Sequence, residues 1–155
     1  MIKALQFLSD KNQSFSKNYL LVGDNDFLYL FIKNQIVKKL QKKDETFVFD
    51  CADKSDSFDQ LINVLGSQDL FSSDKLIIIK NINRLNKKNS EFLLYNFDSD
   101  SNNQIIYIDN NFLSYDYKSK SNTIKSAVTK EFAKILDVID ISTPVSYTHL
   151  TLPTT

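Results

Sequence analysis

The stretch SQDLFSSDKLIIIK (Ser67–Lys80) decides the fold of this chain. Its second half, Leu76–Ile79, is a run of apolar and mostly β-branched residues with the length of a fully buried strand. Its first half places Leu70 and Phe71 side by side between polar residues, after Gly66, where a connection between elements belongs. A large apolar pair in a connection needs a reason, because connections run over protein surfaces.

Before and after this strand in the sequence, short apolar strands alternate with amphipathic helices. The sequence predicts strands at 18–23, 46–50, 75–80, 103–109 and 136–141, with helices at 26–43, 57–66, 86–97 and 123–136. Residues 3–13 are expected to form a short helix or strand, and 110–121 a polar loop. Apolar strands that alternate with helices are typical of a parallel sheet. We therefore predict an α/β fold, a Rossmann-like parallel sheet with helices on both faces.

The helix predicted at 26–43 carries an apolar stripe and basic residues on its other faces. The stripe follows helical spacing and consists of Phe27, Leu28, Phe31, Ile32, Gln35, Ile36 and Leu40. Its lysines are Lys33, Lys38, Lys39, Lys42 and Lys43. We interpret them, like Lys87 and Lys88, as solvated helix faces. Contacts to nucleic-acid phosphates stay open as an alternative, because such contacts add affinity without reading sequence.

The bulk composition limits the class of protein. At 155 residues and zero net charge, the chain has the length of one domain and does not bind nucleic acid mainly through overall charge. No apolar run approaches the length of a membrane span, and the single cysteine, Cys51, fits a reducing compartment. We expect a cytoplasmic protein without membrane association, whose residues 1–143 form one domain.

Residues 144–155 differ in composition from the rest of the chain. They contain the only histidine, His149, and both prolines, and VSYTHLTLPTT (Val145–Thr155) lacks the otherwise abundant Lys, Asn, Asp and Ile. This segment resembles a translated sequencing adapter. We therefore expect a non-native tail, with the natural chain continuing past Thr143 in a different sequence.

The predicted turn GDNDF (Gly23–Phe27) stands where a phosphate-binding loop would follow the first strand of a nucleotide-binding fold. A P-loop needs several glycines, a lysine for the phosphates and a hydroxyl for Mg²⁺, whereas this turn has one glycine and two carboxylates. We interpret Asp24, Asn25 and Asp26 as helix N-caps in a degenerate P-loop that binds no cofactor. A nucleotide-binding P-loop or AAA+ NTPase is the alternative.

Four aspartates follow the first two strands, namely Asp24, Asp26, Asp50 and Asp53. Oxygen ligands suit Mg²⁺, so a receiver-like phospho-acceptor domain is a second alternative. Such a domain needs an acidic residue after its third strand, where this chain has Lys80 and Asn81. We therefore expect no metal site. We also expect no catalytic residues, because Cys51 has no histidine partner outside 144–155.

Two interpretations of Leu70 and Phe71 stay open from the residues alone. In the first, both side chains tuck under the edge of the sheet, although the preceding helix and the following strand supply their own apolar residues. In the second, the pair is exposed and fills a pocket on a partner protein. Each such anchor contributes on the order of 2 kcal/mol to binding.

Three segments together carry a resemblance to a known family. YLLVGDNDFL, FDQLINVLGSQDLFSSDKLIIIKNINRL and FLLYNFDSDSNNQIIYID resemble the first domain of the delta subunit of the bacterial DNA polymerase III clamp loader. The resemblance covers 19–109 well and 110–141 loosely. No single motif decides it, and the order and spacing of the motifs carry it.

The resemblance implies a mechanical role in DNA replication. Leu70 and Phe71 would dock into a hydrophobic pocket of the sliding clamp, with Ser67, Gln68 and Asp69 as flanking contacts. The domain would be an AAA+ domain that does not itself bind ATP. It would serve as a non-catalytic part of the DNA polymerase III holoenzyme, a DNA-directed DNA polymerase and nucleotidyltransferase. The family continues into lid and collar domains, absent here, through which it meets other loader subunits and, indirectly, DNA.

Overall fold

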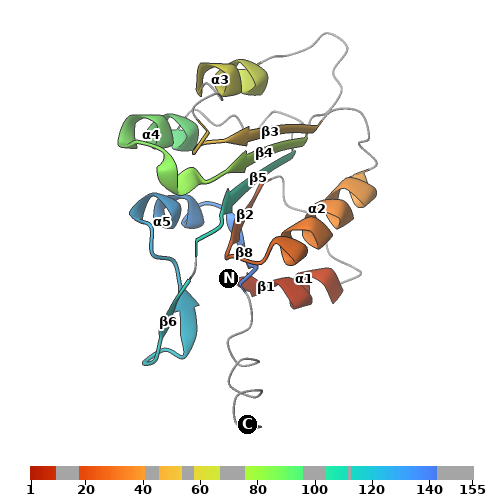
Figure 1. Ribbon diagram of the computed structural model, residues 1–155, viewed down its shortest axis with the longest axis vertical. Helices are drawn as coiled ribbons and strands as arrows, with labels where there is room; N and C mark the ends of the chain where they lie inside the picture. The colour runs from red at the N-terminus through yellow and green to blue at the C-terminus, as the bar shows by residue number, and fades with distance from the viewer. Residues whose placement is uncertain are drawn as a thin grey trace.

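The structure is a computed structural model, and it describes residues 1–9, 18–40, 46–53, 58–66, 76–95, 104–111 and 113–142. The strands are β1 (Ile2–Lys3), β2 (Asn18–Val22), β3 (Thr46–Asp50), β4 (Leu76–Lys80), β5 (Gln104–Asp109), β6 (Ser114–Asp116), β7 (Ser121–Thr123) and β8 (Asp137–Asp140). The helices are α1 (Ala4–Ser9), α2 (Asp26–Leu40), α3 (Phe58–Gly66), the 3-10 helix η1 (Ile82–Arg84), α4 (Lys87–Tyr95) and α5 (Ala127–Ala133). Figure 1 shows their arrangement.

A six-stranded parallel sheet forms the centre of the fold, in the order β1-β8-β2-β5-β4-β3. The strand β4, which contains the apolar run Leu76–Ile79, lies between β5 and β3, with Ile78 opposite Ile106 on one side and Val48 on the other. All residues of Leu76–Ile79 are at most 1% exposed, as a strand covered on both faces requires. The predicted α/β fold with a parallel sheet is confirmed.

Helices cover both faces of the sheet, because alternate residues of each central strand point to opposite sides. One core joins Leu21, Ile78 and Ile106 to α1 and α2. The other core joins Leu20 and Ile77 to α3, η1, α4 and α5. Figure 1 shows α1 and α2 on one side of the sheet and the remaining helices on the other. The predicted covering of both faces is therefore confirmed.

The polar loop predicted at 110–121 is wrong in its central part, where the structure has an antiparallel hairpin of β6 and β7. The helix predicted from Thr123 also begins later. Thr123 belongs to β7, and its hydroxyl donates to the carbonyl of Ser114 at 3.0 Å. The helix starts after Ser126, whose Oγ accepts a hydrogen bond from the backbone N–H of Thr129 at 3.3 Å. Serine side chains favour this capping position over the helix interior.

The apolar stripe predicted on α2 is wrong for two of its members. Phe27 and Phe31 are 77% and 60% exposed, whereas Tyr29, Ile32 and Ile36 are buried against the sheet. Phe27 and Phe31 lie four residues apart and so share a second face of the helix, turned away from the sheet. Helical spacing defines both faces but does not say which one meets the sheet.

The described helices include none that is long and apolar enough to cross a bilayer. The last described strand, β8, lies between β1 and β2, so the chain near Ser142 returns to the first strands. Residues 144–155, predicted to be a non-native tail, lie outside the described residues.

Candidate functional site

The carboxyl ends of the parallel strands, where ligands bind in open α/β sheets, carry the polar turns that the sequence singles out. The turn after β2 begins with Gly23. Its backbone N–H donates to the carbonyl of Asp109 at 3.0 Å, and the N–H of Asn25 donates to the carbonyl of Ile141 at 3.1 Å. Asn25 also caps α2, since its Oδ1 accepts the N–H of Leu28 at 3.2 Å. A P-loop binds phosphates through free N–H groups, and these donors are already taken by protein oxygens.

The chain after β8 fills the space beside this turn. Gly23 has φ +132°, and a Cβ built there would lie 2.6 Å from the carbonyl carbon of Ile141 and 2.7 Å from the Cα of Ser142. Ile141 also donates its N–H to the carbonyl of Val22 at 2.8 Å. The backbone of Ile141 and Ser142 therefore lies directly against the turn, where a nucleotide phosphate would have to approach.

The carboxylates at the strand ends hold neighbouring turns in place. Asp50 Oδ1 accepts from the N–H of Ala52 at 2.9 Å and from Asn81 Nδ2 at 2.7 Å. Asp140 Oδ2 accepts from Asn122 Nδ2 at 3.1 Å. Within the described ranges, no group of three or more His, Cys, Asp or Glu side chains is placed to hold a metal ion. These aspartates act as turn anchors.

Asp109, at the end of β5, is the most enclosed of these carboxylates. It is 4% exposed, and the hydroxyl of Thr129 on α5 donates to its Oδ2 at 2.6 Å. The backbone N–H and side-chain Nδ2 of Asn111 donate to its Oδ1 at 3.0 and 2.8 Å. This carboxylate therefore joins β5, the following turn and α5.

We expect Thr129→Val to lower the free energy of unfolding by about 2 kcal/mol, because it leaves one oxygen of the buried Asp109 carboxylate without its donor. Valine keeps the shape of the side chain, so packing is preserved. Thr129→Ser retains the hydroxyl and should cost about 1 kcal/mol for the lost methyl group. Urea denaturation of both variants measures the difference. A Thr129→Val variant as stable as wild type would show that the hydrogen bond contributes nothing.

The end of β4 is basic, as the sequence indicated. The ammonium group of Lys80 lies 5.3 Å from the centre of the Tyr29 ring on α2, a cation–π arrangement. Burial raises the pKa of Tyr29, and the nearby Asp26 carboxylate raises it further, so the phenol is neutral at physiological pH. The receiver-like alternative also fails on topology. In that order the first strand lies between the second and third, whereas β2 lies between β5 and β8.

A small open hollow of about 150 Å³ lies on the other face of the sheet. It is lined by Phe49, Asp50, Cys51, Phe58, Leu61, Arg84, Leu85, Asn86 and Asn89. Cys51 is half-buried there, and His149, the only histidine in the sequence, lies outside the described residues. The described lining of this hollow therefore offers no thiol–imidazole pair for nucleophilic catalysis.

The predicted partner-binding residues Ser67, Gln68, Asp69, Leu70 and Phe71 lie outside the described residues. The described chain on either side ends at Gly66, the last residue of α3, and resumes at Leu76, the first residue of β4. Leu76 begins β4 at the amino edge of the sheet, the edge opposite the degenerate P-loop turn. The role of the pair stays a prediction.

Sequence reasoning overlooked a group of side chains on the β6–β7 hairpin. Tyr115 and Tyr117 are 43% and 83% exposed, and their ring centres lie 4.9 Å apart. Lys118 and Lys120 follow in the same hairpin and are exposed. The two tyrosines followed closely by two lysines in YDYKSK (Tyr115–Lys120) were the available signal.

The sequence of the chain also matches a model of a known protein family. A family model described as DNA polymerase III, delta subunit matches residues 19–99, more than half of the chain. No match to a curated protein sequence was found. The matched range begins in β2, runs past α4, and includes the 67–75 connection. The chain therefore belongs to the DNA polymerase III delta subunit family.

Proposed function

We propose that this chain is the clamp-binding domain of a non-catalytic clamp-loader subunit, acting in the cytoplasm as part of the DNA polymerase III holoenzyme. Membership of the family gives it a role related to clamp loading in DNA replication. The family match over 19–99 carries the proposal, because that range includes Leu70 and Phe71. In the proposed complex these two side chains enter a hydrophobic pocket of the sliding clamp, flanked by Ser67, Gln68 and Asp69.

The scaffold supports a mechanical role for such an anchor. The connection that bears Leu70 and Phe71 joins α3 to β4, and β4 is hydrogen-bonded to strands on both sides. An anchor attached to a central strand transmits force to the whole domain with little deformation. The domain would bind the opened ring more tightly than the closed ring, since only differential binding shifts that equilibrium.

The proposal is tested by direct binding of the wild-type chain to the immobilised sliding clamp of the same replication system. We expect reversible, saturable binding that does not require nucleotide. An unrelated ring protein of similar charge serves as the negative control. Absence of binding at high protein concentration would overturn the proposal.

The proposal of an ATP-independent AAA+ domain predicts that the chain does not bind MgATP. The backbone N–H groups of Gly23 and Asn25 already donate to protein carbonyls. Asp24 and Asp26 at the same turn would repel the phosphates of the nucleotide. Isothermal titration with MgATP should show no saturable binding up to millimolar nucleotide. Tight binding that depends on Mg²⁺ would restore the NTPase alternative.

Other loader subunits, and DNA through them, are the remaining proposed partners. In the proposed assembly they are reached through lid and collar domains beyond this domain. The described domain would then supply the clamp contact, while neighbouring subunits supply the ATP-driven change that exposes or hides it.

A further inference from the structure

The β6–β7 hairpin stands apart from the two-core architecture. Figure 1 shows it extending away from the sheet below α5. Its strands pair Ser114 with Thr123, Tyr115 with Asn122, and Asp116 with Ser121. It follows β5, the strand next to β2, and therefore leaves the sheet at its carboxyl edge.

The hairpin displays two tyrosines that the core does not use. Tyr117 is 83% exposed and Tyr115 is 43% exposed, and their rings meet edge to face at 4.9 Å between centres. Tyr115 lies in β6, and Tyr117 follows it by two residues. Exposed aromatic rings on a strand offer stacking surfaces that a nucleic-acid base can cover.

Three lysines follow these rings in the sequence of the hairpin and the segment after it. Lys118 and Lys120 lie in the turn of the hairpin and Lys125 follows β7, and all three are exposed. The hairpin's own carboxylate, Asp116, is engaged within the turn. Its Oδ1 accepts the N–H of Lys118 and its Oδ2 accepts the hydroxyl of Ser119, both at 3.0 Å. A chain with zero net charge thus presents a locally positive tip.

Lys120 occupies a backbone conformation that a lysine rarely adopts. Its φ is +53°, in the left-handed region, where glycine is the favoured residue. A lysine at this position costs conformational free energy. Such a cost, at an exposed turn where no packing requires lysine, points to a use for the ammonium group.

The base of the hairpin is fixed to the domain. Asn122 Nδ2 donates to Asp140 Oδ2 at 3.1 Å and to Ser142 Oγ at 3.2 Å, which ties β7 to the end of β8. The hydroxyl of Thr123 donates to the carbonyl of Ser114 across the two strands. The rings and lysines are therefore held on a fixed support, which lowers the entropic cost of binding.

We infer that the hairpin tip is a binding site for single-stranded DNA, with Tyr115 and Tyr117 stacking on bases and Lys118 and Lys120 contacting phosphates. Stacking on tyrosine tolerates every base, and lysine contacts ignore sequence, so binding would be sequence-independent. The choice of DNA rests on membership of a DNA-replication family. The site is separate from the proposed clamp anchor at Leu70 and Phe71.

The mixture of residues favours DNA over a protein partner. Tyrosine is enriched at both kinds of interface, whereas lysine is depleted from the centre of protein–protein interfaces. Single strands are favoured over duplexes because a duplex stacks its bases internally and leaves an exposed ring little to cover. Absence of oligonucleotide binding in the following experiment would overturn the choice of DNA and leave a protein partner as the alternative.

The test is fluorescence anisotropy of a labelled oligothymidylate of about 12 nucleotides, titrated at low salt with the full 155-residue chain. We expect Tyr117→Ala to weaken binding about tenfold through lost stacking, whereas Tyr117→Phe should bind as wild type does. Replacing Lys118 by alanine and Lys120 by glycine should weaken binding about tenfold and lower the slope of log K against log salt by about 1.4. Lys120→Gly also relieves the left-handed backbone, so we expect this variant to stay folded.

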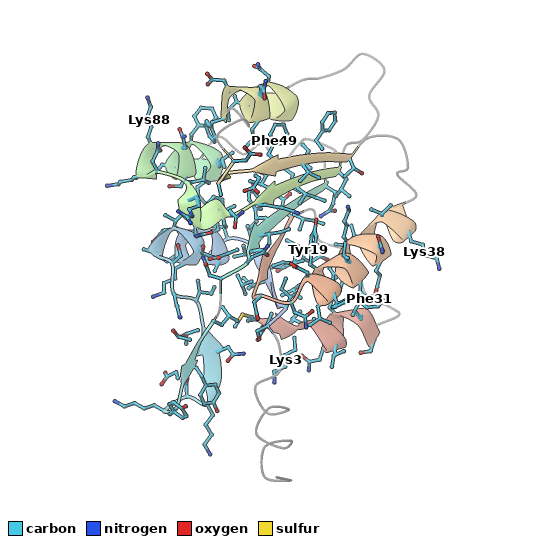
Figure 2. The ribbon with its side chains drawn as sticks, in the orientation of Figure 1. Lys3, Tyr19, Phe31, Lys38, Phe49 and Lys88 are labelled. Carbon is cyan, nitrogen blue, oxygen red and sulfur yellow. The ribbon has the colours of Figure 1, made fainter. Side chains whose placement is uncertain are left out.

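The matched control removes two lysines elsewhere, Lys38→Ala with Lys88→Ala. Figure 2 labels both residues on helices, Lys38 on α2 and Lys88 on α4, and both are exposed. We expect little change in affinity from this control. Equal weakening in the control, no binding of the oligonucleotide, or tighter binding of duplex DNA or RNA would overturn the inference. If the chain binds the sliding clamp but not the oligonucleotide, this inference is wrong and the proposed function is unaffected.

Discussion

Replacing Leu70 and Phe71 together by alanine is expected to abolish measurable binding of the chain to the sliding clamp. Each anchor in a partner's pocket contributes on the order of 2 kcal/mol, so the double variant should lose roughly a thousandfold in affinity. The fold should remain, because the described strands and helices are formed by other residues. Surface plasmon resonance measures the affinity, and circular dichroism checks the fold.

The chain offers a matched control for this variant. Leu5 on α1 and Phe27 on α2 are 69% and 77% exposed, so Leu5→Ala with Phe27→Ala removes the same two side chains from another surface. Clamp binding should survive in this control. If the Leu70 and Phe71 variant binds as tightly as wild type, the anchoring role is refuted. If both variants lose binding equally, the contact is general apolar adhesion and not a specific anchor.

Gly23→Ala is expected to destabilise the domain by about 4 kcal/mol. A side chain at φ +132° is strained, which costs about 1–3 kcal/mol, and overpacking adds a similar amount. The neighbours are backbone atoms of Ile141 and Ser142, which cannot rotate away as the end of a side chain would. Relief would require shifting the chain after β8, whose Ile141 is hydrogen-bonded to Val22 and Asn25.

Urea denaturation of Gly23→Ala measures this effect, with Asp26→Ala as the control in the same turn. Asp26 is exposed at the first position of α2, so its loss should cost less than about 1 kcal/mol through the helix dipole. Comparable stabilities of the two variants would contradict the close approach of Ser142 to the turn. A large loss in Gly23→Ala alone would support it.

The strands were the most predictable elements of this chain. The runs that became β2, β4 and β5 are apolar on both faces because helices cover both sides, and such runs are readable without a structure. The helix α4 was also anticipated from its amphipathic pattern, and the structure adds that Asn86 caps it, since its Oδ1 accepts the N–H of Asn89 at 2.7 Å. The candidate site was anticipated only in part. The residues of the turn indicated a degenerate P-loop. They did not indicate that its backbone N–H groups donate to the carbonyls of Asp109 and Ile141.

The β6–β7 hairpin was not predicted because distant contacts hold it in place. The hairpin of β6 and β7 is short and polar, and it is held to the domain by Asn122 contacting Asp140 and Ser142. These contacts join residues that are 18 and 20 positions apart in the sequence. Local periodicity over three-residue strands is too weak to distinguish a hairpin from a loop.

The sequence by itself determined the class of fold, the order of its elements and the absence of P-loop residues at Gly23–Phe27. It could do so because burial on two faces, helix capping and phosphate binding each demand particular residues at short spacing. Only the tertiary structure decided which face of α2 is buried, where β6 and β7 pair, and that Ile141 and Ser142 close the turn after β2. Those outcomes depend on contacts between distant parts of the chain, which local sequence patterns do not specify.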